Sequence, residues 1–345
     1  MGIFSQQTEY FGLDIGSCGI RVVQLKSSGK PVLMTYGHVA VPPKVAMSDA
    51  PADISKIAAV VRQLIKDARI SSKNVICGVP SSKVFATVIT TPRLGHDELA
   101  KAIKLQADQY IPLNVKDVKL DWVVLGPGKT PEEQEVLIVA APNTVTEKYL
   151  SICEQAGLDL IALEPNAIAL SRAVVQANDL AVLVLDIGSV ATDISIVHAN
   201  MPKLLRSINV GGSTFMKAVE QNLGLDAAQA EQFTRKFGLT QTKLEGQVFK
   251  AIKPSMDQLT AEIKRSVDFF ANQYPTIKLE KLVLSGGTTA LPELPTYLST
   301  ATGLPVEIGN AWAKVQYPSN LQNQLMGIAT EFGVAAGLAE RDLLS

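Results

Sequence analysis

One pentapeptide, Leu-Asp-Ile-Gly-Ser, occurs twice in the chain, at residues 13–17 and 185–189. In both copies apolar residues lead into the aspartate, and an alternating apolar run resumes directly after the serine. This pattern predicts a tight β-hairpin with an Asp-x-Gly-Ser turn between its strands. Glycine lets backbone N–H groups approach an anion, serine adds a hydroxyl donor, and aspartate can hold a hydrated divalent cation. Two such turns facing each other would clamp a polyphosphate and its metal, so the repeat favours a duplicated phosphate site over two ordinary hairpins.

The composition narrows the class of protein. At 345 residues the chain can bury a large core and is expected to form two lobes. A net charge of −1 without a long Lys/Arg run argues against nucleic acid as the main partner. No apolar stretch is long enough to span a bilayer, and the first ten residues lack the pattern of a signal peptide. Three scattered cysteines without a CxxC pair favour reduced thiols in a cytoplasmic protein.

A compact insert is expected between Ser81 and about Leu158. Its apolar periodicity predicts a strand at 84–91, a helix at 96–111, strands at 120–125 and 135–141, and a helix that ends at Gly157. The order β-α-β-β-α describes a small α+β subdomain.

Later segments carry further glycine-containing turns. Glu164 and Pro165 are expected to open an alanine-rich helix, and a strand at 203–209 runs into Gly211 and Gly212. The pattern then predicts a capped helix at 227–237, a long amphipathic helix at 246–272, a buried strand at 281–284 that stops at Ser-Gly-Gly-Thr, and a closing helix at 327–340 rich in small residues.

This ordered set resembles the actin, Hsp70 and sugar-kinase ATPase superfamily. The five signatures of that superfamily have candidates in order, at residues 14–21, 164–170, 186–193, 284–288 and 327–338. The position of the insert resembles the FtsA branch. The opening Phe-Gly-Leu-Asp-Ile-Gly-Ser, the insert's Ala-Asp-Gln-Tyr-Ile-Pro and the Ala-Gly-Leu before Glu164 resemble the PilM family of type IV pilus assembly proteins over essentially the whole chain.

The resemblance implies an α/β, actin-like ATPase fold with two ribonuclease-H-like lobes and an FtsA-type α+β insert. Residues 1–82, 159–180 and 327–345 would form lobe I, subdomain 1A, and residues 83–158 the insert, subdomain 1C. Residues 181–222 and 275–326 would form lobe II, subdomain 2A, and residues 223–274 subdomain 2B.

The same resemblance implies that the cofactors are ATP and Mg²⁺. Asp14 and Asp186 would hold the magnesium through water, although both carboxylates could instead only cap their turns. Phosphate contacts would come from the backbone or hydroxyl groups of Gly16, Ser17, Cys18, Gly188 and Ser189. Arg21 would pair with the β-phosphate, or would be an exposed strand residue.

The remaining candidates would surround the nucleoside. Gly211 and Gly212 would lie beside the ribose, or would be a plain strand-to-helix turn. Glu231 resembles a ribose-binding glutamate, but Thr234 stands where relatives carry lysine, and Arg235 is the nearest substitute. Gly286, Gly287 and Thr288 would cover the adenine and the α-phosphate.

Glu164 bears on catalysis. In hydrolysing relatives a glutamate or glutamine near this position orients the attacking water, whereas a carboxylate at a helix start is also favoured as a cap. With this ambiguity and the missing lysine, the expectation is ATP binding with weak or no hydrolysis.

As a function, the resemblance implies a nucleotide-dependent platform for pilus biogenesis and twitching motility. It would dock the N-terminal cytoplasmic peptide of PilN, act with other pilus inner-membrane assembly proteins, and lie in the cytoplasm at the inner membrane through these partners, with a homo-oligomer left open. The docking groove is expected where the insert meets lobe I, unless its apolar residues only join the two. The alternatives are an FtsA-like filament-forming division scaffold and, third, a sugar-kinase-type phosphotransferase.

Overall fold

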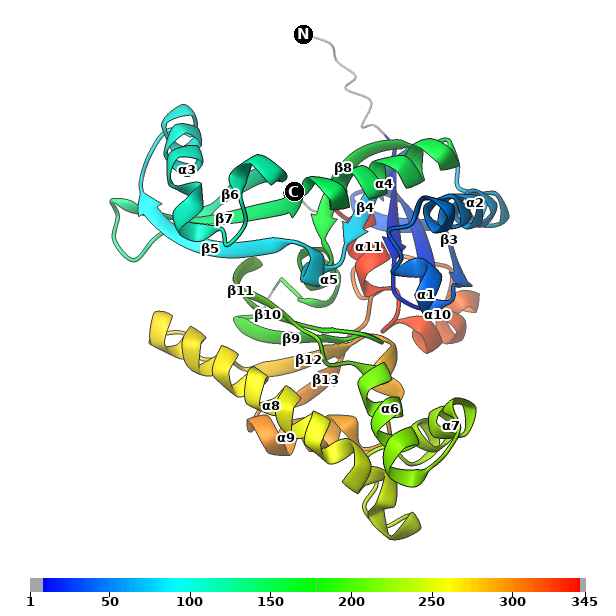
Figure 1. The fold of residues 1–345 in the computed structure, drawn as a ribbon. Coiled ribbons are helices and arrows are strands. Elements are labelled where there is room, and N and C mark those ends of the chain that lie inside the picture. The colour runs from blue at the N-terminus through cyan, green and yellow to red at the C-terminus, as the bar shows by residue number, and fades with distance from the viewer. Residues whose placement is uncertain (1–8, 178, 342–345) are drawn as a thin grey trace. The chain divides into compact units, whose positions relative to one another are not determined.

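The computed structural model describes residues 9–177 and 179–341 (Figure 1). The chain divides into two compact units. Unit 1 comprises Met1–Pro80, Asn143–Val174 and Asn310–Ser345, and unit 2 comprises Ser81–Pro142 and Val175–Gly309. The four subdomains predicted above are a finer division and stay a prediction. Within the described ranges no helix has both the length and the apolar character needed to cross a membrane.

Unit 1 is built on a five-stranded sheet in the order β3-β2-β1-β4-β8. Its first three strands are an antiparallel meander, and β1, β4 and β8 run parallel. The first predicted hairpin is confirmed, because Asp14 pairs opposite Arg21 and Ile15 opposite Ile20. The strands are β1 (Phe11–Ile15), β2 (Gly19–Ser28), β3 (Lys30–Ala40), β4 (Asn74–Val79) and β8 (Asp159–Pro165).

Helices cover both faces of this sheet. Helices α2 (Pro51–Asp67) and α4 (Asn143–Ala156) pack together on one face, where the Sγ atoms of Cys77 on β4 and Cys153 on α4 lie 3.6 Å apart. Helices α5 (Asn166–Val174) and α11 (Gly333–Ala339) pack together on the other face. Two short helices, α1 (Pro43–Ala46) and α10 (Gln322–Ile328), complete the set.

On the α5–α11 face the backbones of neighbouring elements are in direct contact. A Cβ atom on Gly337 of α11 would lie 1.7 Å from the carbonyl oxygen of Ala169 on α5. A Cβ atom on Gly12 of β1 would lie 2.3 Å from the carbonyl oxygen of Ala335 on α11. Real Cβ atoms do not approach so closely, so only glycine fits at these two positions.

Two expectations for this region were wrong. The predicted closing helix at 327–340 is broken, since α10 ends at Ile328 and α11 begins at Gly333. At the break the side chain of Phe332 is buried in the core. Its ring centroid lies 5.7 Å from that of Tyr36 and 5.5 Å from that of Trp312. Glu164 and Pro165 end a strand rather than open a helix, because β8 continues its pairing with β4 through both residues.

Unit 2 repeats the topology of the first sheet. Its five-stranded sheet has the order β11-β10-β9-β12-β13, again an antiparallel meander followed by two parallel strands. The second predicted hairpin is therefore confirmed, and the repeat of the pentapeptide extends to a whole sheet. The strands are β9 (Ala181–Ile187), β10 (Thr192–His198), β11 (Met201–Ile208), β12 (Lys281–Ser285) and β13 (Val306–Ile308).

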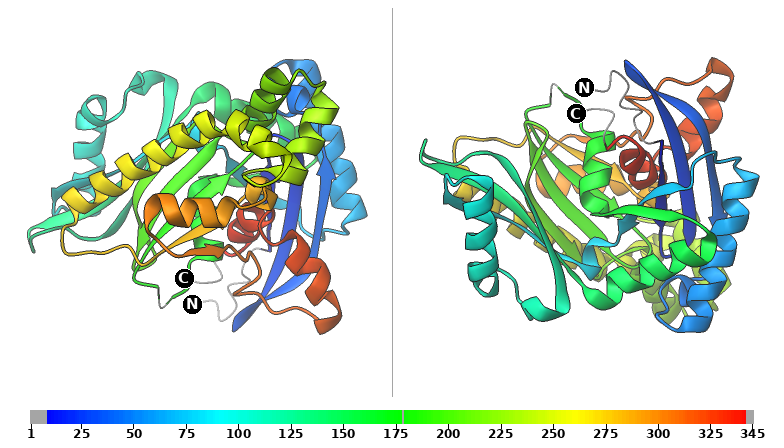
Figure 2. Two further views of the ribbon diagram at one scale, coloured as in Figure 1. Left: turned by 90° about the horizontal axis from the view of Figure 1, so that it is seen from below. Right: turned by 90° about the horizontal axis from the view of Figure 1, so that it is seen from above.

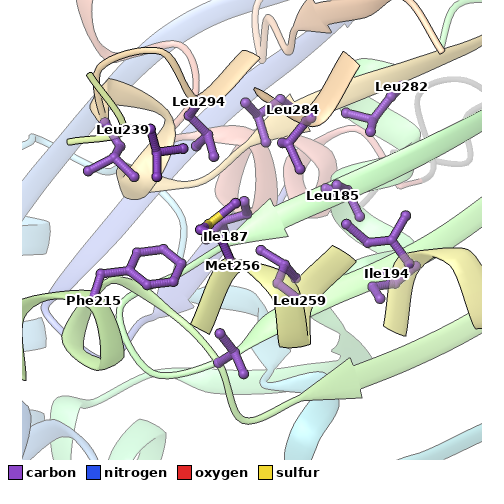
Figure 3. Packing of buried hydrophobic residues seen from close by; sticks show 14 of the residues in the cluster. Leu185, Ile187, Ile194, Phe215, Leu239, Met256, Leu259, Leu282, Leu284 and Leu294 are labelled. Carbon is purple, nitrogen blue, oxygen red and sulfur yellow. The ribbon is translucent and has the colours of Figure 1, made fainter. Parts of the chain in front are cut away.

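The core of unit 2 lies between this sheet and its helices. Leu185 and Ile187 of β9 and Leu284 of β12 pack with Met256 and Leu259 of the long helix, and all five are buried (Figure 3). The long helix and α9 lie side by side across the sheet (Figure 2, left). The helices are α6 (Gly212–Leu223), α7 (Ala227–Phe237), α8 (Gln247–Gln273) and α9 (Leu294–Thr302).

The insert forms a three-stranded antiparallel sheet, in the order β5-β7-β6, with one helix on it. Strands β5 (Phe85–Pro92), β6 (Val118–Pro127) and β7 (Glu133–Pro142) and helix α3 (His96–Tyr110) follow the predicted order. Leu99 and Ile103 of α3 are buried with Val136 and Ile138 of β7. The last helix of the predicted motif, α4, packs on α2 in unit 1. Among the described residues, single turns of 3₁₀ helix lie at Ser81–Lys83 and Val115–Asp117 in the insert and at Leu244–Gly246, Gly287–Ala290 and Ser319–Leu321 outside it.

A buried polar contact fixes the insert to the second sheet. Glu135 of β7 forms an ion pair with Lys203 of β11 and accepts a hydrogen bond of 2.7 Å from the hydroxyl of Tyr274. Lys203 Nζ also lies 5.6 Å from the centroid of the Tyr274 ring. A buried carboxylate needs such partners, because an unpaired charge away from water is costly.

We predict that Gly337→Ala destabilises the protein, because its new methyl group would overlap the Ala169 carbonyl oxygen. Overpacking of this kind costs about 1–3 kcal/mol, and a lower midpoint of urea unfolding would show it. Gly327→Ala on α10 is the matched control, since its Cβ meets open space and alanine favours a helix. Equal midpoints for the two variants would contradict the close crossing.

Candidate functional site

The first turn joins β1 to β2 and is closed by a hydrogen bond from Gly16 N–H to Gly19 O, 3.0 Å long. Asp14 and Arg21 face each other across the hairpin, with Nη1 of Arg21 3.5 Å from Oδ2 of Asp14. A Cβ on Gly16 would lie 3.3 Å from the same Nη1, so the guanidinium lies over the turn. The turn thus carries its own cation.

Arg21 is held between two carboxylates. Its Nη2 donates a 2.9 Å hydrogen bond to Oε2 of Glu331, which lies two residues before α11. The side chain is 18% exposed, so Arg21 is largely covered. Burial raises the pKa of Asp14, while the charge and hydrogen bond of Arg21 lower it. The pKa of Asp14 is therefore raised overall, and Arg21 only partly offsets the effect of burial.

The second turn has the same backbone and a different charge. Gly188 N–H donates to Ala191 O over 3.0 Å, as Gly16 does to Gly19 in the first turn. Opposite Asp186, however, stands Asp193, where the first hairpin has Arg21. Burial raises the pKa of Asp193, opposed by hydrogen bonds from hydroxyl groups that include that of Ser81.

Two further loops pack directly on the second turn. The N–H groups of Gly212 and Ser213 donate to the carbonyl oxygens of Gly188 and Ser189, over 3.0 and 2.7 Å. The hydroxyl of Thr288 donates to Gly188 O over 3.1 Å. The structure thus brings together Asp186, Gly188, Ser189, Gly211, Gly212, Gly286, Gly287 and Thr288. The first N–H groups of α6 hold the turn in place through these bonds.

An open hollow of about 450 Å³ lies beside the second turn. Lys217, which the sequence did not single out, lines it from α6. The signal was present, because Lys217 follows Ser213 and Thr214 by four and three residues and so shares their face of a helix. The lining residues are Val190, Asn209, Ser213, Thr214, Lys217, Ala218, Gln221 and Ser255.

The candidates on α7 pair with each other. Nε of Arg235 lies 2.9 Å from Oε1 of Glu231, and both side chains are about half exposed or more. Thr234 is buried and donates its hydroxyl to Ala230 O over 2.7 Å. Thr234 is therefore a helix-packing residue, whereas Arg235 beside it is exposed.

Glu164 lies in one row with the first turn. It is in register with Gly78 of β4, and Gly78 is in register with Asp14 of β1. The carboxylate of Glu164 is bound through both oxygens by Arg172 of α5, with Nη1 3.0 Å from Oε2 and Nη2 on Oε1. Nη1 also donates to Gly337 O of α11 over 2.7 Å.

A second carboxylate lies near this pair. Glu340 is fully buried, and neither of its carboxylate oxygens has a hydrogen-bond partner among the described residues. Burial raises the pKa of Glu340 to about 7, against the opposing charges of Lys314 and Arg172. Lys314 is itself fixed, because its Nζ donates to the backbone oxygen of Arg172 over 2.5 Å.

Comparison with known proteins identifies the family to which the chain belongs. A sequence model described as "Type IV pilus assembly protein PilM" matches residues 12–343. The chain belongs to the PilM family. The PilM-family chain is also similar to a solved structure titled "PilM-PilN type IV pilus biogenesis complex", at 27% identity and a TM-score of 0.84, over 97% of this chain and 98% of that one.

Two more distant structures show the fold alone. The ethanolamine utilization protein EutJ from Carboxydothermus hydrogenoformans is 16% identical over 95% of this chain and 88% of its own, with a TM-score of 0.57. MreB5 of Spiroplasma citri bound to ADP is 12% identical over 96% and 95%, also with a TM-score of 0.57. The predicted actin-like ATPase fold of this PilM-family chain is thereby confirmed.

We predict that Glu340→Gln removes a loss of stability at high pH. The carboxyl pKa is about 7 in the fold against 4.5 for an ordinary glutamate, so between these values the folded chain holds a proton that the unfolded chain has lost. The free energy of unfolding therefore falls as the pH rises through this window, by up to about 3 kcal/mol. Glutamine cannot ionise, so the free energy of unfolding of the variant should rise relative to that of the wild type between pH 5 and pH 8.

Urea unfolding at several pH values measures this difference. Glu132→Gln, at an exposed position of the insert, is the control and should leave the pH profile unchanged. Parallel pH profiles for Glu340→Gln and the wild type would refute the buried, unpartnered carboxylate.

Proposed function

We propose that this chain is an ATP-binding platform of type IV pilus assembly, and that it docks the N-terminal cytoplasmic peptide of PilN. The observation that carries the proposal is the matched pair of phosphate turns. Both have the same pentapeptide, the same closing hydrogen bond and the same place in two sheets of equal strand order. Membership of the PilM family supplies the pilus role.

The residues of both turns fit a nucleotide phosphate chain. In unit 1, Gly16, Ser17 and Cys18 reach the surface at the turn, with the Arg21 cation above it. In unit 2, Gly188 and Ser189 are partly exposed, and the exposed Gly287 leaves open space where a side chain would be. Asp14 and Asp186 would hold Mg²⁺ through water, and that ion would neutralise phosphate charge when bound. The candidates for the nucleoside end are those predicted above, Gly211, Gly212, Glu231, Arg235, Gly286, Gly287 and Thr288, and Lys217 is an additional cation near them.

The proposed partner follows from the similar PilM-PilN complex. The insert offers a suitable surface, because β6 is an edge strand of its sheet and carries the exposed Val123. Val124, the next residue of β6, is exposed as well. An extended peptide can add to a strand edge and cover such apolar side chains, which are otherwise a liability in water. PilN would then tether the chain to the inner membrane.

We predict that ATP with Mg²⁺ raises the melting temperature by several degrees, because a ligand at 100 times its Kd adds about 2.7 kcal/mol to the free energy of unfolding. Asp14→Ala and Asp186→Ala should each abolish the magnesium-dependent part of the shift. Asp108→Ala, at an exposed position of α3, should keep the whole shift. Wild-type shifts in both turn variants would show that the twin turns are not the nucleotide site.

We also predict that Val123→Lys and Val124→Lys weaken binding of the PilN N-terminal peptide at least tenfold, or about 1.4 kcal/mol. Calorimetric titration of the peptide into each variant measures the Kd. Ile308→Lys is the matched control, because Ile308 is equally exposed on β13, an edge strand of the other sheet in unit 2. If the insert variants bind as tightly as the control, the peptide docks elsewhere.

A further inference from the structure

We propose that Arg172 is a positioning residue that holds Glu164 away from an attacking water, so that bound ATP is kept rather than hydrolysed. The inference rests on the proposed ATP-binding function and names a regulation of the same site. It starts from Glu164, which lies in one row with Asp14 across the first sheet. Both oxygens of its carboxylate are bound by Arg172.

The bidentate pair of Arg172 and Glu164, called the grip below, is stabilised by contacts from other parts of unit 1. Arg172 projects from α5 and binds the carboxylate at the end of β8 with two of its nitrogens. The same guanidinium donates to Gly337 O of α11, and Lys314 holds the backbone of Arg172. A bidentate arginine–carboxylate pair is among the strongest hydrogen-bonded contacts in proteins, and here both side chains are at most one-fifth exposed. Glu164 would have to give up these bonds to turn toward a water molecule.

The direction of the grip is away from the first turn. Arg21 and Asp14 meet Glu331, which precedes α11, whereas Arg172 and Glu164 meet Gly337 in its second half. Glu331 lies in the break before α11 and Gly337 within the helix, so the two contacts are made at different points of this segment. Asp14 and Glu164 are also two strands apart, at about 4.8 Å a strand. A general base must reach its proton within about 3 Å, and a carboxylate with both oxygens bound to Arg172 must first break one of these bonds to do so.

The test compares phosphate release after nucleotide binding has been measured separately. Affinity for a fluorescent ATP analogue with Mg²⁺ is determined first for the wild type and each variant. Single-turnover phosphate release from ATP is then measured with protein in excess. Arg172→Gln frees Glu164, and we expect release at least tenfold faster than in the wild type. Arg172→Lys keeps the charge without the bidentate grip and should give an intermediate rate.

Two controls separate this role from general damage to the fold. The double variant Arg172→Gln/Glu164→Gln should return to the slow wild-type rate, because the acceleration depends on the freed carboxylate. Arg265→Gln breaks an exposed arginine–glutamate pair on α8, with Glu262, and should also release phosphate at the wild-type rate. Structural damage alone lowers a rate, so a gain that requires Glu164 marks a positioning role.

The outcomes distinguish this inference from the function on which it rests. A wild-type chain that binds no ATP would overturn the proposed function, and the inference with it. An Arg172→Gln variant that binds ATP normally but releases phosphate at the wild-type rate would overturn the inference alone. So would an acceleration that persists in the double variant.

A measurement on the intact protein covers the case in which Arg172→Gln does not fold. The ¹³C resonance of the Glu164 carboxyl is assigned by its loss in Glu164→Gln and followed as ATP and Mg²⁺ are added. An unchanged resonance at saturation supports the grip, since the ion pair persists with nucleotide bound. A resonance that moves on binding shows that the carboxylate is released, which would overturn the proposal.

Discussion

The backbone contact between α5 and α11 is the constraint on which unit 1 depends. Gly337 and Gly12 remove the two side chains that would hold α11 away from α5 and β1. With α11 this close, its carbonyl at Gly337 reaches Arg172, and Glu331 just before it reaches Arg21. One helix of seven residues therefore organises both charged groups of the first sheet. A single methyl group at the crossing would disturb the turn and the Glu164 pair together.

The two turns show that a duplicated backbone can diverge in charge while keeping its geometry. The closing hydrogen bonds at Gly16 and Gly188 have the same length and span the same number of residues. The residue opposite the turn aspartate is nevertheless Arg21 in one copy and Asp193 in the other. The first turn thus contains its own positive charge, whereas near the second turn Lys217 is supplied by α6. The shared pentapeptide thus sets the backbone of both turns, while the residues around it set their charge.

The features predictable from the sequence are those that local pattern determines. Both hairpins, the insert's β-α-β-β order and the glycine turns around the second hairpin turn follow from short-range periodicity and turn residues. The break before α11 could not be foreseen, because it depends on Phe332 finding Tyr36 and Trp312 in space. Arg172 was missed for the same reason. Its contact with Glu164 spans eight residues across a strand-to-helix turn, and its contact with Gly337 spans 165.

The insert is attached to the rest of the chain in two ways, by the peptide backbone and by the contact of Glu135 with Lys203 and Tyr274. Both covalent links of Ser81–Pro142 lead into unit 1, through β4 and α4, while its ion pair leads into the second sheet through β11. A mechanical force on the insert is therefore carried both by the backbone and by the Glu135–Lys203 ion pair. Because that bond is buried, dissolved salt weakens it little. Load applied by a partner at the insert would reach both sheets at any physiological ionic strength.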